Sequence, residues 1–145
     1  MTIKKHLLLL SVLIFLPFTA CSDKVKISGR VTFPDGKPVS IGEVNFATRE
    51  KSYLGRLNQE GYYAPGELKD GDGIPAGIYQ VWLSKTSELK YKLNKNGEYT
   101  DEYIIIEKVA PKYHSNNSGL IFEVKRGGTK TFDFTVERAK PSSQK

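Results

Sequence analysis

The stretch "VKISGRVTFPDGKP", residues 25–38, points to the fold class, because it joins a strand pattern to a tight turn. Apolar and polar side chains alternate in its first half, and a period of two places one set on one face of a β-strand. That face holds Val25, Ile27, Gly29, Val31 and Phe33. Pro34 then fixes φ, and Asp35 and Gly36 suit the later positions of a turn. The stretch predicts a strand with one buried face, followed by a turn.

The same pattern recurs along the rest of the chain, with Gly, Pro, Asn and Asp between the segments at intervals of about ten residues. The further strand segments are "VSIGEVNFAT" (39–48), "SYLGRLNQEGYYA" (52–64), "IYQVWLSK" (78–85), "YIIIEKV" (103–109) and "LIFEVKRGGTKTFDFTVE" (120–137). No segment has a helical apolar stripe, although "SELKYKL" (87–93) is long enough for one helical turn. About seven short strands with this spacing predict an all-β, antiparallel β-sandwich.

The last of these segments is expected to be a hairpin that turns at "RGGTK", residues 126–130. Apolar side chains alternate on both of its arms, which is typical of two strands that each cover a core. The expected inward side chains are Leu120, Phe122 and Val124 on the first arm and Phe132, Phe134 and Val136 on the second.

The N-terminus has the pattern of a lipoprotein signal peptide. Lys4 and Lys5 precede a charge-free apolar run, residues 7–18, which is too short to span a bilayer comfortably. "FTAC" (18–21) follows and ends in the only cysteine of the chain. We therefore expect a signal peptide over residues 1–20, acyl chains on Cys21 and a lipidated linker over residues 21–24. The alternative is an ordinary secretory signal with a cysteine nearby by chance.

Lipidation predicts an extracytoplasmic protein that is anchored to the membrane of the cell envelope through Cys21. Two or three acyl chains give durable anchoring, because each buried methylene contributes about 0.8 kcal/mol. Ser22, in place of an aspartate, favours the outer membrane if the cell is Gram-negative. No disulfide is expected, since the chain has one cysteine.

Removal of residues 1–20 leaves 145 − 20 = 125 residues, enough for one domain, which we place at residues 25–138, before a disordered tail at 139–145. The removed segment has two lysines, so the net charge becomes (22 − 2) − 16 = +4. The densest basic patch is "LKYKLNK", residues 89–95. Lysines interleaved with Tyr91 and Leu93 suit an anionic ligand or nucleic acid, but they also protect the edge of a sheet. The signal peptide excludes nucleic acid as a partner.

Four motifs in order resemble the transthyretin-like or carboxypeptidase-regulatory-like domains of bacterial lipoproteins, which are common in planctomycete-type envelopes. The motifs are "ISGRVTFPDGKPVSIGEVNF", "GRLNQEGYY", "GIPAGIYQVWLS" and "PKYHSNNSGLIFEVKRGGTKTFDFTV". The resemblance implies a seven-stranded Greek-key sandwich with buried or corner tyrosines at Tyr63, Tyr79 and Tyr113. Asn58 stands where such domains usually have an acid. The resemblance implies no catalytic residues.

Catalytic and metal-binding patterns are weak, and we expect neither an enzyme nor a cofactor. His114 has Ser115 and Ser118 as neighbours, but residues 110–119 include no acid to orient its ring. Asp70 and Asp72 have the spacing of the first ligands of a calcium loop, and Ile74 stands where a third ligand is needed. They remain a weak calcium candidate beside the alternative of a glycine-rich turn.

Trp82 is the strongest candidate for binding. Alternation along "IYQVWLSK" turns Tyr79, Val81 and Leu83 inward and Trp82 outward, and Tyr62 is outward if Tyr63 is inward. Outward aromatic side chains can bind a protein partner or stack on a sugar. The alternative is that residues 85–102 form a loop that covers this face.

The sequence therefore predicts a lipid-anchored β-sandwich of the cell envelope that acts as a non-catalytic structural or protein-interaction module. The alternative is an accessory domain that binds a carbohydrate or another small ligand. Its expected partners are the membrane, through Cys21, and an envelope protein or a glycan.

Overall fold

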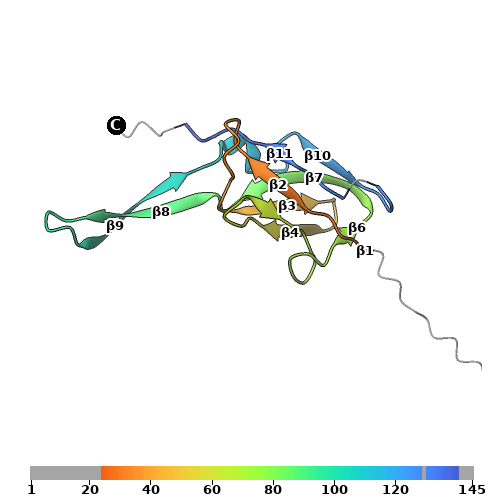
Figure 1. Ribbon diagram of the computed structural model, residues 1–145, viewed down its shortest axis with the longest axis horizontal. Coiled ribbons are helices and arrows are strands. Elements are labelled where there is room, and N and C mark those ends of the chain that lie inside the picture. Colours follow the sequence, from red (N-terminus) through yellow and green to blue (C-terminus); the bar gives the residue numbers. More distant parts are fainter. Residues whose placement is uncertain (1–23, 129, 141–145) are drawn as a thin grey trace, which may run out of the picture.

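Seven strands of the computed structural model, which describes residues 24–128 and 130–140, form two facing sheets (Figure 1). The first sheet has the order β10 (Leu120–Val124), β7 (Gly77–Ser84), β3 (Glu43–Ala47) and β4 (Ser52–Arg56). The second has the order β11 (Phe134–Thr135), β2 (Gly29–Thr32) and β5 (Tyr62–Tyr63). The prediction of an all-β sandwich of about seven strands is confirmed. The predicted signal peptide and Cys21 lie outside the described residues.

The remaining elements lie at the margins of the sandwich. They are the pair β1 (Lys24–Val25) and β6 (Ile74–Pro75), the pair β8 (Ser87–Leu93) and β9 (Tyr99–Glu107), and the 3₁₀ helix η1 (Pro111–Tyr113). No helix within residues 24–128 and 130–140 is long and apolar enough to cross a membrane.

The connections follow a Greek key. β3, β4 and β5 succeed one another around one edge of the sandwich, and β7 returns to pair with β3. The strand pairs of the two sheets are antiparallel, except that β11 is parallel to β2. A parallel pair needs a long crossover, which the chain provides through the rest of the domain.

The core lies between the sheets and is centred on Phe46, which is fully buried on β3. Its ring centroid lies 5.9 Å from that of Tyr63 and 6.4 Å from that of Phe132, both on the opposing side. The predicted inward positions of β2 and β7 are all buried. Alternation gave these faces correctly because each sheet has one apolar and one solvated side.

Two tyrosines of the core bond to backbone carbonyls. The hydroxyl of Tyr63 donates to the carbonyl oxygen of Phe132 at 2.7 Å, and that of Tyr79 donates to Pro75 at 2.8 Å. Burial raises the pKa of Tyr79 to about 12 and raises that of Tyr63 further, so both remain protonated donors. Tyr113 is also buried. The expectation that these three tyrosines are buried is confirmed.

The prediction of a final hairpin is wrong. β10 pairs with β7, whereas β11 pairs with β2 in the other sheet, so the chain crosses the sandwich between them. Phe122 and Phe132 consequently stack across the core, with ring centroids 4.4 Å apart. Their inward direction was predicted correctly, because alternation gives the face of a strand and does not give its neighbour.

Candidate interaction site

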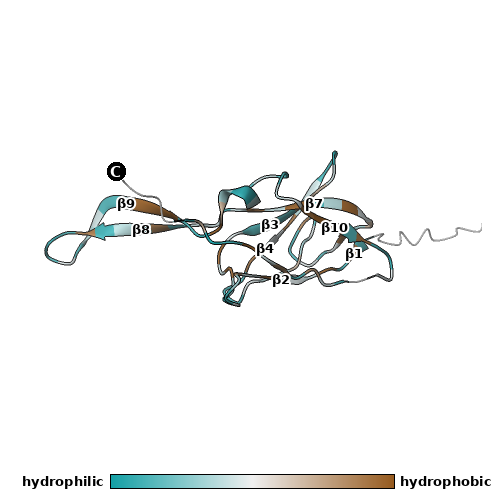
Figure 2. Cartoon of the chain, turned by 90° about the horizontal axis from the view of Figure 1, so that it is seen from above, coloured by the Kyte–Doolittle hydropathy of each residue, from teal (hydrophilic) through white to brown (hydrophobic). Residues whose placement is uncertain are grey.

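The chain between β7 and η1 forms an arm that projects from the sandwich (Figures 1 and 2). We use "the arm" for residues 87–107, in which β8 and β9 pair with each other as a separate two-stranded sheet. At the tip, the amide of Asn94 donates to the carbonyl oxygen of Glu98 at 2.9 Å, and Gly97 adopts a φ of 82°. The arm therefore has the local structure of a well-formed hairpin, and residues 87–93 are a strand rather than a helical turn.

The pairing register gathers the large apolar side chains of the arm on one face. Leu89 pairs with Ile105, Tyr91 with Tyr103, and, beyond a bulge, Leu93 with Tyr99. Paired residues and residues two apart share a face of a ribbon. We call the set Leu89, Tyr91, Leu93, Tyr99, Tyr103 and Ile105 the apolar face. The ring centroids of Tyr91 and Tyr103 lie 5.9 Å apart, which shows that the two side chains are neighbours.

The intervening positions are mostly polar and stabilise the hairpin itself. The ammonium group of Lys92 lies 2.8 Å from the carboxylate of Glu102 across the two strands. The hydroxyl of Thr100 donates to the carbonyl oxygen of Lys92 at 3.1 Å. Cross-strand pairs of this kind contribute about 0.2–1 kcal/mol each, which holds the strands together but covers no apolar surface.

All six side chains of the apolar face are open to solvent, with exposed fractions from 48% at Tyr91 to 80% at Tyr99. An aromatic side chain buries about 150–250 Å² when it is covered, so the three tyrosines leave roughly 270–450 Å² open. Full burial of a leucine or isoleucine side chain is worth about 1.5–3 kcal/mol, which at about 25 cal/mol per Å² corresponds to roughly 60–120 Å². With their exposed fractions of 53%, 57% and 65%, Leu89, Leu93 and Ile105 add roughly 100–200 Å² of open apolar surface. The total, roughly 370–650 Å², matches the largest apolar patch of an ordinary monomer, about 300–600 Å², and such patches are often interaction sites.

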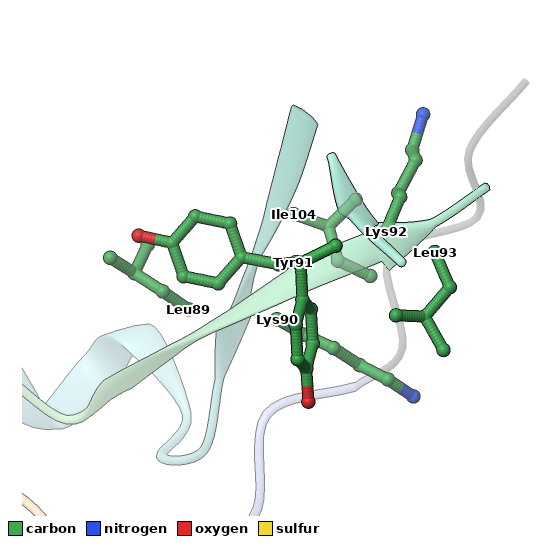
Figure 3. A pocket seen from close by; sticks show the side chains of 7 residues that line it. Leu89, Lys90, Tyr91, Lys92, Leu93 and Ile104 are labelled. Carbon is green, nitrogen blue, oxygen red and sulfur yellow. The ribbon is translucent and has the colours of Figure 1, made fainter. Parts of the chain in front are cut away.

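An open groove of about 690 Å³ follows the arm and is lined by side chains of both strands (Figure 3). The residues that line it are Leu89, Lys90, Tyr91, Lys92 and Leu93 from β8 and Tyr99 and Ile104 from β9, so both sides of the ribbon contribute to it. A two-stranded ribbon has no second layer, so its side chains leave a hollow that a partner can fill. An isolated hairpin is also only marginally stable in water. The arm therefore has the properties of a surface that a partner covers.

The base of the arm is fixed by a hydrogen-bonded cluster. Thr86, which is 1% exposed, donates its hydroxyl hydrogen to Glu107 at 2.6 Å, and Ser87 donates to the same carboxylate at 3.1 Å. Nε2 of His114 lies 3.0 Å from the Thr86 hydroxyl and must donate, because that hydroxyl has given its hydrogen to Glu107. The cluster ties both strands of the arm to the loop after η1.

This cluster predicts a pH dependence. Burial raises the pKa of Glu107, but the hydrogen bonds from Thr86 and Ser87 and the charge of His114 outweigh it and hold the pKa below its usual value of 4.5. A lowered pKa in the folded state means that the stabilisation is fully present above about pH 4.5 and is lost as the pH falls through the lowered value. Glu107→Gln should flatten the fall of the free energy of unfolding between about pH 5 and pH 3, measured by urea denaturation. An unchanged slope would contradict this assignment.

His114, with Ser115 and Ser118 as neighbours, is the weak catalytic pattern of the sequence. The structure brings a carboxylate close to it, since Oε1 of Glu107 lies 3.6 Å from Nε2. The hydroxyl between them belongs to Thr86, which is buried, whereas Ser118 donates to the carbonyl oxygen of Val81 on the neighbouring strand. Thr86 therefore links Glu107 to His114 at the base of the arm. The hydroxyl groups of Ser115 and Ser118 bond to backbone groups instead of to His114.

Trp82 and Tyr62, the expected binding face, do not form one face. Trp82 lies on β7 between the buried Val81 and Leu83, whereas Tyr62 lies next to the buried Tyr63 on β5. These strands belong to opposing sheets, so the two side chains point away from opposite sides of the sandwich. Tyr62 is 49% exposed and lies under the guanidinium group of Arg30, 5.2 Å from its ring centroid.

Residues 85–102 do not cover Trp82 as a loop. They form most of the arm, which extends away from the sheet (Figure 1). Trp82 is nonetheless half-buried among its neighbours on the outer side of the sheet.

Trp82→Ala should therefore lower the free energy of unfolding by about 1–2 kcal/mol, less than the 3–5 kcal/mol expected for a fully buried tryptophan. Chemical denaturation measures it. A loss above about 3 kcal/mol would make Trp82 a core residue and remove it from any list of binding residues.

The calcium candidates have other partners. The carboxylate of Asp70 lies 3.8 Å from the guanidinium group of Arg56, and that of Asp72 accepts a hydrogen bond from the amide of Lys69 at 3.2 Å. Within residues 24–128 and 130–140, no group of three His, Cys, Asp or Glu side chains is placed to hold a metal ion. Asn58 accepts hydrogen bonds from the amides of Glu60 and Tyr62, both at 2.9 Å, and so closes its turn.

The sequence did not lead to a prediction that residues 87–107 form an interaction site, although the segments 89–95 and 103–109 already had the pattern of apolar strands. "LKYKLNK" was recognised as an edge strand or a basic patch, and residues 89–93 do lie in β8 at an edge of the arm. "YIIIEKV" was predicted as one of the strands of the sandwich, but Tyr103 and Ile105 lie on the arm and are 54% and 65% exposed. Two adjacent apolar strands with no third segment to cover them would have indicated a projecting ribbon.

Comparisons with known proteins identify loose structural likenesses only. No family model and no curated protein sequence matches the chain. Among solved structures, the major pilin subunit BcpA of Bacillus cereus is similar over 81% of this chain and 30% of the pilin, with 12% identity and a TM-score of 0.38. A 9R-lipoxygenase from Cyanothece PCC8801 is similar over 78% of this chain and 16% of the enzyme, with 16% identity and a TM-score of 0.31. The chain thus spans under a third of either protein, and at these scores the likeness gives no information on function.

Proposed function

We propose that this protein is a lipid-anchored, transthyretin-like β-sandwich of the cell envelope that acts without catalysis, by binding another polypeptide through the arm. The observation that supports it most is the apolar face, whose six large side chains are between 48% and 80% exposed. A surface of this size is unfavourable in water unless a partner covers it. The sandwich then serves as the rigid support of the arm.

The position of the arm agrees with display away from a membrane. β1, which follows the expected lipid anchor, lies at one end of the molecule and the arm at the other (Figures 1 and 2). A sandwich that is tethered through its N-terminus would present the arm on the side away from the bilayer. The apolar face would therefore meet a protein partner rather than the lipids of its own membrane.

A carbohydrate partner is less well supported. Sugar binding favours aromatic rings that offer one flat platform, but the rings of Tyr91 and Tyr103 are inclined to each other by 63°. Trp82 and Tyr62 lie on opposing sheets and cannot act together. Both strands of the arm also have a free outer edge, since β8 and β9 pair as a separate sheet, and such edges suit main-chain pairing with a polypeptide.

The experiment that tests the proposal is mild cross-linking of whole cells that express the full chain with a C-terminal tag, followed by solubilisation and identification of the co-purified proteins. The proposal expects one polypeptide at near-stoichiometric amounts, either another envelope protein or a second copy of this chain. Recovery of the chain with no polypeptide above background would contradict it and would direct the next test to a panel of glycans.

A further inference from the structure

We propose that the polypeptide that covers the apolar face is a second copy of this chain, and that two arms pack face to face about a twofold axis that runs along them. This inference rests on the proposed function, because it names the partner of the same site. Three observations support it: the area of the apolar face, the side of the ribbon from which the lysines of β8 project, and the position of the N-terminus relative to the arm.

The area of the apolar face allows a dimer at the lower limit of specific interfaces. The apolar face leaves roughly 370–650 Å² open on one copy. Two such faces together bury roughly 740–1,300 Å², and the upper end of this range reaches the smallest specific interfaces, about 1,200 Å². The groove along the arm, which is lined by Lys90, Lys92 and Ile104 as well as by Leu89, Tyr91, Leu93 and Tyr99, adds surface that side chains of the other copy can contact.

The charged side chains of β8 do not lie on the apolar face. Lys90 and Lys92 alternate with Leu89, Tyr91 and Leu93, so they project from the other side of the ribbon, where Lys92 pairs with Glu102. Two apolar faces can therefore meet without bringing these lysines together. A twofold axis along the arms would lay β8 of one copy over β9 of the other, and a twofold axis across the arms would lay β8 over β8.

The twofold axis along the arms is favoured because it keeps both N-termini on one side. The arm and β1 lie at opposite ends of the long axis of the molecule (Figures 1 and 2). Rotation about an axis parallel to the arm leaves both β1 strands at the same end of the dimer. Two copies anchored in one membrane can therefore pair in this way, whereas an axis across the arms would separate their anchors.

The described residues near the C-terminus lie at the base of the arm. Residues 108–110 pair with residues 137–139 at the base of the arm, where the amide of Ala139 donates to the carbonyl oxygen of Lys108 at 3.1 Å. Beyond this point the sequence is Lys-Pro-Ser-Ser-Gln-Lys, which has no large apolar side chain. Those residues cannot replace the apolar surface of a second arm.

The test uses the full chain and a matched pair of cysteine variants. Ile105 on the apolar face and Ile121 on β10 are the same residue type with nearly equal exposure, 65% and 64%. Ile105→Cys should give a cross-linked homodimer with a short bis-maleimide in intact cells, and the yield should be at least about tenfold above that of Ile121→Cys. The unchanged chain, whose only cysteine is Cys21, measures cross-linking through the N-terminus.

Sedimentation of the full chain in detergent provides the second measurement. Ile105→Lys should raise the dissociation constant of the dimer at least about thirtyfold, because twofold symmetry places the substitution in the interface twice. Ile121→Lys should leave it within about threefold of the unchanged chain. Equal cross-linking at positions 105 and 121, or a wild-type chain that remains monomeric up to about 100 μM, would overturn the proposal.

These results separate the two proposals. If the whole-cell experiment recovers a different polypeptide and Ile105→Cys gives no homodimer, a second copy is excluded while the arm remains an interaction site. If neither experiment recovers a polypeptide at the arm, both proposals fail.

Discussion

Phe46→Ala is expected to lower the free energy of unfolding by about 3–5 kcal/mol, the usual cost of removing a buried phenylalanine from a packed core. Phe46 is fully buried on β3, and its ring contacts side chains of both sheets. Alanine at this position would leave a cavity that the surrounding rings cannot close without loss of their own contacts. Urea denaturation followed by tryptophan fluorescence of Trp82 measures the effect.

The matched control is Ile121→Ala in the same sheet. Its side chain is 64% exposed, so its truncation should change the free energy of unfolding by less than about 0.5–1 kcal/mol. A loss below about 1.5 kcal/mol for Phe46→Ala would show that the two sheets do not enclose one packed core around this ring.

The double substitution Tyr91→Ser and Tyr103→Ser is expected to reduce the amount of co-purified polypeptide at least tenfold. The two rings lie side by side at the middle of the apolar face, 48% and 54% exposed. Aromatic anchors at the centre of an interface often cost 2 kcal/mol or more when they are truncated, which corresponds to about thirtyfold in affinity. Neither ring contacts the core of the sandwich, so the free energy of unfolding should change by less than about 1 kcal/mol.

Ile121→Ser provides the control for this experiment, because Ile121 is 64% exposed and lies on β10 of the sandwich, outside the arm. It should change the recovered polypeptide by less than about threefold. Equal recovery with the double variant and with the unchanged chain would show that the arm is not the contact surface, and a large fall in stability would show that the rings support the fold.

Most of the fold could be predicted from alternation. The inward side chains of β2, β3 and β7 follow from a period of two, because these strands face a core on one side and solvent on the other. The partner of each strand could not be predicted in this way. Phe122 and Phe132 both point inward, but the pattern is the same whether their strands are neighbours in a hairpin or members of facing sheets.

The site was harder to predict, because its exposure depends on what the rest of the chain leaves uncovered. An apolar strand such as "YIIIEKV" is normally a core strand, and at Val109 this expectation holds. Tyr103 and Ile105, a few residues earlier, are exposed only because β9 has β8 as its partner and extends beyond both sheets. Trp82 and Tyr62 failed as a joint site for a similar reason, since their outward directions were right and their separation across two sheets was not visible in the sequence.

The central claim is that a polypeptide covers the arm in the cell, and a photo-cross-linking amino acid at position 103 tests it most directly. Placed at Tyr103 in the full chain and illuminated in native cells, it should give one discrete adduct at high yield. The same amino acid at position 121, where the side chain is 64% exposed against 54% at position 103, should give only background. Equal, diffuse labelling from both positions would contradict the claim that the arm is an interaction site.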